Sequence, residues 1–325
     1  MQFRHLNKVL ATTAVTFCSI FAAGQPVQAI DFRTPTSDWT YVNDSARDGT
    51  DGKLNGVGRS SAFEMFGMAF KEVEDELFIG INSNLGLEGQ YRSNVSDDQN
   101  IGWGDMFFNF TSGNLQEASA QEQLFGIRFA GTNDSGVSET GVYSNVKGMN
   151  VTSTNKGWSK FNQYKNWVNN TAKDKLTDEN GTVINVGEKG EVGFGDLTVE
   201  EASQYFNPEN ENRKTLNSIQ SGTKIGDITM LTNQELETLA FATDNDPEYT
   251  QAKTFGFKFN RNLLPDGDAL ISLLAECIND GMAMKIHFEK NGSGISPEDV
   301  PEPSSIVSLG LISLALAGIR KKSKQ

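Results

Sequence analysis

The chain has 325 residues, with 42 Asp and Glu against 28 Lys and Arg, and a formal net charge of −14. Six of the basic residues lie before residue 30 or after residue 303, where no acid occurs, which leaves 22 basic residues against 42 acids and a central net charge of about −20. A surface this negative repels phosphate backbones, which excludes nucleic acid as a partner. Solubility outside the cell or binding of divalent cations would explain the charge, and solubility is the simpler explanation.

The first 29 residues predict a signal peptide. A basic start precedes an apolar run over residues 9–23, and residues 27–29 (Val-Gln-Ala) form a small-residue cleavage site. A first transmembrane helix is the alternative, and the cleavage pattern argues against it. We expect signal peptidase to cleave after Ala29.

Residues 30–288 predict a single, mainly β domain: a two-layer antiparallel β-sandwich, jelly-roll-like, with a few short helices in its connections. Gly (32) and Phe (21) are abundant, which is typical of β proteins. Residues 63–73 and 76–85 predict a hairpin with apolar residues on both faces, so we expect it at the centre of a sheet. Further strands are expected in the segments 104–111, 124–130, 141–154, 226–231, 254–260 and 282–288. Residues 270–278 fit a helix or a strand equally by periodicity.

Short helices are expected where a capping residue precedes Glu by three positions. These pairs are Asn114 with Glu117, Thr198 with Glu201, and Thr232 with Glu235.

Four aromatic residues recur at a spacing of three: Trp158, Phe161, Tyr164 and Trp167. One face of a short helix against the core is the simpler interpretation. A sugar-stacking platform is the alternative. Exposure of Trp158, Tyr164 and Trp167 on a concave face would favour the platform, and burial of all three would exclude it.

Removal of the signal peptide leaves Cys277 and His287 as the last cysteine and histidine. No internal disulfide can then form, and no zinc site can use two histidines. A Ser-His-Asp triad would need His287, which lies in an alternating pattern and is expected on a strand. Cys277 is expected to be a buried small side chain, with a reactive or lipidated thiol as the alternative.

Several loops gather oxygen ligands, and the Gly-spaced segment 44–56 is the best candidate for calcium. Its proposed ligands are Asp48, Asp51 and Asn55, with Asp44 in the same loop. Segments 97–105, 133–134 and 244–248 are weaker candidates, and no EF-hand pattern occurs. Ordinary turn chemistry explains the same residues. No G-x-S-x-G, H-E-x-x-H or phosphate loop is present, so we expect no enzyme and assign no catalytic residue.

The C-terminus predicts a spacer over 289–299 and a sorting signal over 300–325. Pro301-Glu302-Pro303 precedes an uncharged apolar run over 306–319 and a basic stop at Arg320, Lys321 and Lys322. A permanent single-pass anchor is the alternative. The run is shorter than the roughly 20 residues that a comfortable span needs, which favours a transient anchor.

This tail resembles the PEP-CTERM sorting signal of bacterial surface proteins, a resemblance that implies processing by exosortase. The turn Glu276-Cys277-Ile278-Asn279-Asp280 resembles the E-C-x-N-D motif of the same proteins. With segments 63–72, 100–110 and 124–137, it makes residues 55–290 similar to the XDD type, third subgroup, of exosortase-dependent surface proteins. The resemblance favours a strand over 270–278 and a turn at 279–281. Ile278 stands where a small residue is usual.

We therefore expect an exported protein with a transient inner-membrane anchor, then a cell-surface or extracellular-matrix location. The expected role is structural or adhesive, with exopolysaccharide as a candidate partner and calcium as the one candidate cofactor. A calcium-dependent carbohydrate-binding module is the alternative. A secreted hydrolase ranks third and predicts a cleft with a carboxylate of raised pKa.

Overall fold

The computed structural model describes residues 4–5, 39–93, 95, 98–177, 181–206, 213–241 and 252–289. All of them belong to the first of two compact units, which ends at Glu289. The predicted cleavage at Ala29, the spacer beyond Glu289 and the tail from Pro301 to the basic stop lie outside the described residues. Within the described ranges, no helix combines the length and apolar character needed to cross a membrane.

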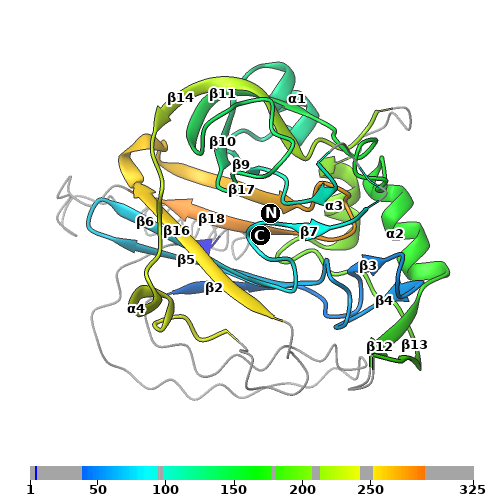
Figure 1. Ribbon diagram of the computed structural model, residues 1–325. Helices are drawn as coiled ribbons and strands as arrows, with labels where there is room; N and C mark the ends of the chain where they lie inside the picture. The colour runs from blue at the N-terminus through cyan, green and yellow to red at the C-terminus, as the bar shows by residue number, and fades with distance from the viewer. Residues whose placement is uncertain are drawn as a thin grey trace, which may run out of the picture. The chain divides into compact units, whose positions relative to one another are not determined.

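Two large sheets form the framework of this unit (Figure 1). All strand pairs in them are antiparallel except β1 with β18. The seven-stranded sheet has the order β1 (Arg4–His5), β18 (Gly281–Phe288), β17 (Gly267–Leu274), β9 (Met106–Asn109), β10 (Leu124–Arg128), β11 (Gly141–Met149) and β14 (Ser218–Gly226). The five-stranded sheet has the order β15 (Thr229–Met230), β16 (Lys253–Asn260), β6 (Glu76–Ser83), β5 (Met65–Val73) and β2 (Thr40–Asn43). The mainly β, antiparallel prediction is confirmed, and jelly-roll-like connectivity stays a prediction.

The main core lies between the two sheets. Alternation on β16 places Phe255, Phe257 and Phe259 in this core, and Phe257 stacks on Phe129 with ring centroids 5.2 Å apart. The hairpin β5–β6 lies inside the five-stranded sheet, between β16 and β2, which confirms its predicted central position. Burial of each aromatic side chain contributes about 1.5–3 kcal/mol to folding.

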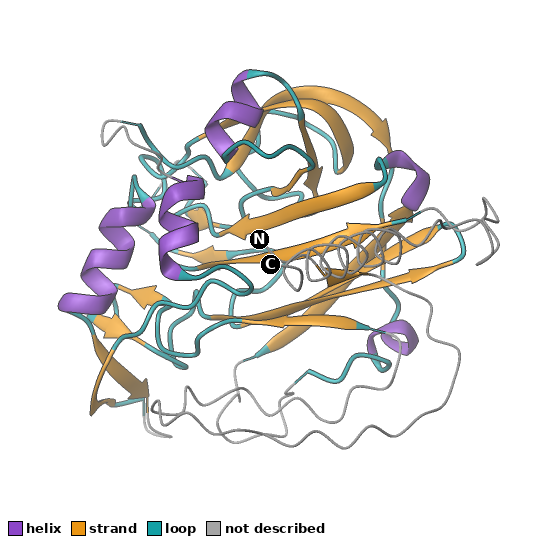
Figure 2. Cartoon of the chain, turned by 180° about the vertical axis from the view of Figure 1, so that it is seen from behind, coloured by secondary structure: helices purple, strands orange, loops and turns teal. Residues whose placement is uncertain are grey.

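Helices cover the outer face of the seven-stranded sheet and build a second core there (Figure 2). They are α1 (Leu115–Ala120), α2 (Phe161–Asn170) and α3 (Val199–Phe206), while α4 (Asn233–Leu236) packs near the outer face of the five-stranded sheet. All three predicted capping boxes are present, before α1, α3 and α4. Phe161 and Tyr164 of α2 are buried, which confirms the helical interpretation of the aromatic spacing.

Two small sheets and a short helix complete the unit. One sheet has the order β13 (Val183–Lys189), β12 (Lys173–Thr177), β4 (Gly56–Val57) and β3 (Thr50–Asp51), and the other pairs β7 (Gln90–Tyr91) with β8 (Asn100–Ile101). A 3-10 helix, η1 (Arg261–Leu263), follows β16. The strands β2, β12, β13 and β14 were not predicted from the sequence.

The turn between β17 and β18 is unusually constrained. β17 is a strand as the family resemblance implied, and it ends at Leu274. Ile278 is fully buried with a φ of 51°, a conformation that is costly for a β-branched residue. Its N–H donates to the Ala275 carbonyl at 2.9 Å, and the Ala275 N–H donates to the Asp280 carbonyl at 3.1 Å. Cys277 is buried inside this turn, as expected of a small apolar side chain.

Candidate metal centre

Four carboxylates meet inside the protein where the loop between β2 and β5 crosses the start of β18. Asp44 directly follows β2, and Glu64 and Asp280 directly precede β5 and β18. Asp48, Glu64 and Asp280 are 0% exposed and Asp44 is 7% exposed. One carboxylate oxygen from each of the three aspartates lies within 4.8 Å of the others.

Each of the three carboxylates that precede β5 (Asp44, Asp48 and Glu64) accepts a hydrogen bond from a backbone N–H on one of its two oxygens. Gly193 and Gly195 donate to Asp48 Oδ2 at 2.8 Å and to Asp44 Oδ1 at 3.2 Å. The Gly49 N–H donates to Glu64 Oε2 at 3.0 Å. The second oxygens (Asp44 Oδ2, Asp48 Oδ1 and Glu64 Oε1) are buried without any hydrogen-bond partner. Each side chain is therefore fixed in place while one acceptor is left unsatisfied, which is costly in an interior.

Asp280 is held differently, because both of its oxygens accept hydrogen bonds. The Met65 N–H donates to Oδ2 at 2.7 Å, and the Gly281 N–H donates to Oδ1 at 2.7 Å. The hydroxyl of Tyr164, from α2, donates to Oδ1 at 3.3 Å. Asp280 thus joins the start of β18 to β5 and to the helical layer.

Burial and mutual repulsion both oppose ionisation of this cluster. Burial raises the pKa of Asp44, Asp48 and Glu64 well above the ordinary value, and the neighbouring carboxylates raise it further. Burial also raises the pKa of Asp280, to about 8. The charges that act most strongly on Asp44, Asp48 and Glu64 all come from other acids. Buried carboxylates in proteins are normally paired with a cation or bound to a metal, and no side chain supplies that charge among these contributions.

The chemistry of the oxygen atoms in the cluster indicates which kind of cation would bind there. All of these atoms are carboxylate oxygens, which suits a hard cation better than zinc or copper. Calcium takes six to eight oxygen ligands at about 2.3–2.6 Å and accepts irregular geometry, whereas magnesium needs a near-ideal octahedron and retains waters. The three aspartates Asp44, Asp48 and Asp280 therefore fit a calcium ion, with Glu64 as a further buried carboxylate beside them.

At Gly195 the backbone passes close to the backbone of Ala283, and this contact forms one wall of the site. The φ of Gly195 is 58°, a region that glycine enters without strain, and a side chain at this position would meet the carbonyl of Ala283. Gly49 is similarly close to Glu64, because a Cβ there would lie 2.7 Å from the Glu64 Cα.

The proposed ligands from the sequence divide between the cluster and its surroundings. Asp48 lies in the cluster, with Asp44 of the same loop. Asp51 instead pairs with Arg92, Oδ2 to Nη2 at 3.0 Å. Asn55 is exposed at a turn, with a φ of 49°. Of the weaker candidates, Asp105 accepts hydrogen bonds that include those from Asn133 and Ser135, and residues 244–248 lie outside the described ranges.

Sequence reasoning missed Glu64 and did not group Asp280 with the loop. The alternating pattern placed Glu64 on the same face of the predicted hairpin as Phe66 and Met68, whereas it directly precedes β5 and is fully buried in the cluster. Asp280 accepts the amide of a residue 215 positions earlier, and local spacing carries no signal for such a contact. The E-C-x-N-D resemblance was the one available signal, since Asp280 is its last residue.

The other residues of this motif tie the turn to neighbouring loops. The Glu276 carboxylate accepts the Gly102 N–H at 2.6 Å and also the Asp134 N–H, and burial raises its pKa to about 8. Asn279 and Thr50 exchange two hydrogen bonds: the Thr50 N–H donates to the Asn279 carbonyl at 2.7 Å, and Asn279 Nδ2 donates to the Thr50 carbonyl at 2.9 Å.

The aromatic platform is not assembled as the carbohydrate alternative required. Tyr164 is buried beside Asp280, while Trp158 and Trp167 are partly buried with ring centroids 5.6 Å apart. His287 lies on β18 between Asp268 and Glu289, which confirms its prediction as a strand residue.

Comparisons with known protein families, with curated proteins and with solved structures find no match for this chain. The interpretation of the carboxylate cluster therefore depends on its own geometry.

Proposed function

We propose that this chain is an exported, non-enzymatic surface protein whose β domain is stabilised by a buried divalent cation, with Ca²⁺ as the best fit. The observation that carries the proposal is the set of three buried carboxylate oxygens without partners, on Asp44, Asp48 and Glu64. A divalent cation between them and Asp280 would offset two of the four negative charges and join the loop before β5 to the start of β18. Extracellular calcium modules bind calcium with dissociation constants of about 10⁻⁴–10⁻³ M, so a modest affinity is enough for the proposed role.

Proton sharing is the competing explanation for the same cluster. Asp44 and Asp280 lie close enough for a hydrogen bond, which two ionised carboxylates cannot form because neither has a donor. A proton would satisfy one such pair and leave the cluster insensitive to calcium. The two explanations therefore differ in their response to added cation.

Export and sorting are supported by the sequence. The predicted signal peptide implies signal peptidase, and the PEP-CTERM-like tail implies exosortase, a transient inner-membrane anchor and then a surface or extracellular location. If the tail is a sorting signal, mass spectrometry of the extracellular protein will find no peptide containing Lys324.

The burial of the cluster supports a structural or adhesive role over hydrolysis. The carboxylates with the most strongly raised pKa lie in the interior, with Glu64 and Asp280 fully buried, so a substrate could not reach them. A secreted hydrolase needs such a group in an open cleft.

Thermal unfolding of the exported protein tests the cation. After dialysis against EDTA, addition of calcium to 100 times its Kd should stabilise the fold by about 2.7 kcal/mol and raise Tm, because a ligand of the native state shifts unfolding by mass action. Magnesium at equal concentration should raise Tm less.

Matched variants show whether the effect comes from this cluster. Asp48→Asn and Asp280→Asn should lower calcium affinity, measured by calorimetry, about 100-fold, whereas Asp75→Asn, in the exposed turn of the β5–β6 hairpin, should not. Unchanged calcium affinity in both cluster variants, or a Tm of the parent protein that calcium does not move, contradicts the proposal.

A further inference from the structure

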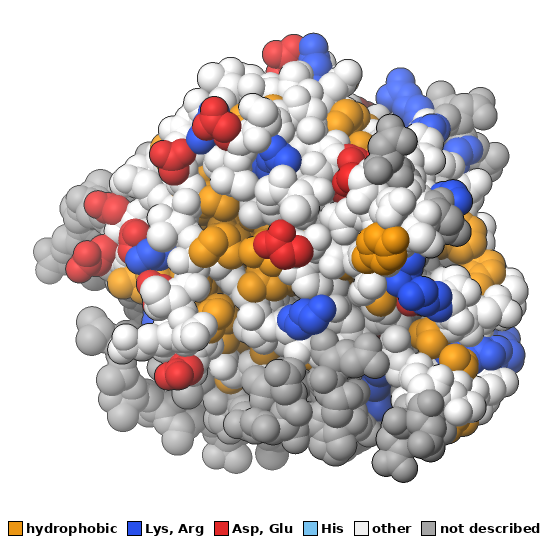
Figure 3. Space-filling view, viewed as in Figure 1, with side chains coloured by type: hydrophobic (Ala, Val, Ile, Leu, Met, Phe, Trp, Pro, Cys, Tyr) orange, Lys and Arg blue, Asp and Glu red, His pale blue; other side chains and the backbone are white. Residues whose placement is uncertain are grey.

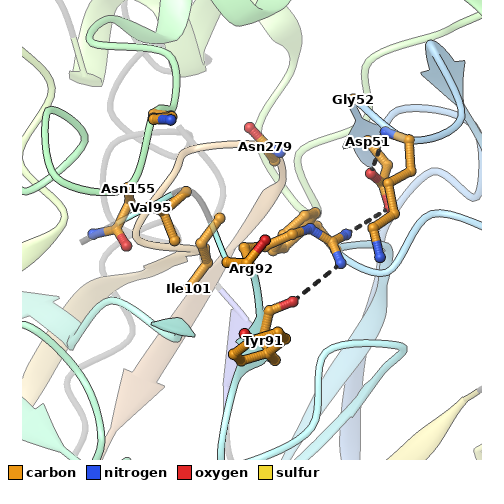
Figure 4. A pocket seen from close by; sticks show the side chains of 12 residues that line it. Asp51, Gly52, Tyr91, Arg92, Val95, Ile101, Asn155 and Asn279 are labelled. Carbon is orange, nitrogen blue, oxygen red and sulfur yellow. Dashed lines mark hydrogen bonds and ion pairs between the residues drawn. The ribbon is translucent and has the colours of Figure 1, made fainter. Parts of the chain in front are cut away.

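A second feature lies beside the metal centre: an open pocket of about 570 Å³. This volume falls in the range of small-molecule sites. Its walls come from separate parts of the chain: the loop after β3, the β7–β8 pair, residues 155–156 and the β17–β18 turn. Figure 4 shows Arg92 between Asp51 and Tyr91, with Val95, Ile101 and Asn155 on the opposite side.

The floor of the pocket is apolar and its edge carries an aromatic ring. Phe63, Val95 and Ile101 are buried residues that line the pocket. Tyr91 also lines it and is 63% exposed, which is unusual for a large aromatic side chain. An exposed ring next to an apolar floor can stack against the C–H face of a sugar ring.

The charge of the pocket is opposite to that of the protein. Lys53, Arg92 and Lys156 line it, and Asp51 is its one acidic residue, so the lining carries a net charge of about +2 where the central part of the chain carries about −20. Arg92 also lies over the Phe63 ring, 5.2 Å from its centroid, and pairs with Asp51. Lys53 and Lys156 are exposed. On the face seen in Figure 3, apolar side chains gather near the centre, with both acidic and basic side chains beside them.

A buried amide side chain forms part of one wall of the pocket. Asn155 lines it, is 1% exposed, and has an Oδ1 atom without a hydrogen-bond partner. Its Nδ2 is already engaged with Asp134 Oδ2 and the Val151 carbonyl, so its orientation is fixed. The Oδ1 oxygen has almost no accessible surface, so Asn155 shapes the wall of the pocket and is not a ligand contact.

From these features we propose that the pocket binds an anionic saccharide, a sugar ring that carries a carboxylate or sulfate group. The ring stacks on Tyr91, and the anion lies among Lys53, Arg92 and Lys156. The inference deepens the proposed surface role and rests on it for the extracellular location, and none of the pocket contacts involves the cation directly.

The pocket and the metal centre nevertheless share backbone. Phe63 and Asn279 of the pocket directly precede Glu64 and Asp280 of the cluster, and Asp51 belongs to the same loop as Asp48. A cation that fixes the cluster would also fix three walls of the pocket. Chelation should therefore weaken saccharide binding without touching the ligand.

Calorimetry with defined oligosaccharides on the exported protein tests the pocket. Short glucuronate oligosaccharides and their neutral methyl esters examine carboxylate recognition, and sulfated and unsulfated glucose oligomers examine sulfate. We expect at least one anionic form to bind ten or more times more tightly than its neutral partner, and the binding to weaken as salt concentration rises.

Surface variants locate the binding. Lys53→Gln with Lys156→Gln, and separately Tyr91→Ala, should each weaken the anionic ligand about tenfold or more while leaving the calcium-dependent Tm unchanged. Lys189→Gln with Lys214→Gln makes the same charge change at two exposed residues outside the pocket lining and should have little effect.

Equal affinity for charged and neutral forms, absence of binding, or equal effects of the two lysine pairs overturns the inference. These outcomes with a calcium-raised Tm leave the proposed function standing. Selective binding of the anionic form with no calcium effect on Tm would support the saccharide pocket and contradict the proposed cation.

Discussion

Two regions of this protein bury charge, and they balance it in different ways. Arg261, at the end of β16, is 1% exposed and has its partners beside it: Asp266 Oδ1 at 2.8 Å from Nη2 and the Leu264 carbonyl at 2.9 Å from Nη1. Glu72 Oε2 lies 3.8 Å from Nε, and the Phe288 ring centroid lies 4.8 Å from the guanidinium carbon. The carboxylate cluster around Asp280 gathers four acids, and the strongest charges acting on them have the same sign.

The difference separates a site whose charge is balanced within the folded chain from one whose charge, we propose, is balanced by an external ion. Both arrangements use backbone hydrogen bonds to fix the charged groups, so geometry alone does not distinguish them. Charge balance does, because an unpaired buried charge costs several kcal/mol and a cluster of like charges costs more. The comparison predicts that only the second region responds to calcium.

Removal of the arginine should give the largest effect. Arg261→Met should destabilise the fold by about 3–5 kcal/mol, because it removes a buried charge together with its contacts to Asp266 and the Leu264 carbonyl. Urea unfolding with and without calcium measures this loss, and the loss should be equal in both conditions. A loss that calcium repairs would mean that the two regions are not independent.

A smaller effect is expected at the wall of the metal centre. Gly195→Ala should cost about 1–3 kcal/mol, since its φ of 58° is strained for alanine and its amide holds Asp44. Gly131→Ala is the matched control, because a Cβ there would meet nothing within 4 Å. Calcium affinity should fall in Gly195→Ala and stay constant in the control; a constant affinity in both would show that this wall does not position Asp44.

The smallest effect concerns His287, a partly exposed side chain whose charge is balanced by neighbouring acids. Hydrogen bonding to Asp268, with a further contribution from Glu289, raises the pKa of His287 above its ordinary value of 6.5. A raised folded-state pKa stabilises the fold below about pH 6.5, and this contribution is lost as pH rises through the folded value. His287→Gln should therefore cost about 0.5 kcal/mol at pH 5.5, since solvent screens the pair, and almost nothing at pH 9. Urea unfolding at both pH values measures this, and an equal cost would contradict the assignment.

Local sequence patterns predicted the elements that depend on local physics. The β5–β6 hairpin, the strand with Phe255, Phe257 and Phe259, and the three capping boxes all follow from alternation or from short-range hydrogen bonds. The strands β12 and β13 were missed, because β13 is exposed along its whole length and presents no buried face to alternate. Tertiary contacts decide which acids share a site, so the sequence placed Asp48 in a calcium loop yet could not separate it from Asp51 or join it to Asp280.

The order of the four cluster acids along the chain has a consequence for the proposed export of the protein across the membrane. Asp44, Asp48 and Glu64 emerge early, whereas Asp280 precedes the last strand of the unit. If the protein is exported and binds calcium as we propose, a half-translocated chain lacks the Asp280 carboxylate, so we expect it to bind the ion weakly and to stay flexible during secretion. The domain would become rigid only after the whole unit has crossed the membrane, so calcium binding would favour the fully exported protein.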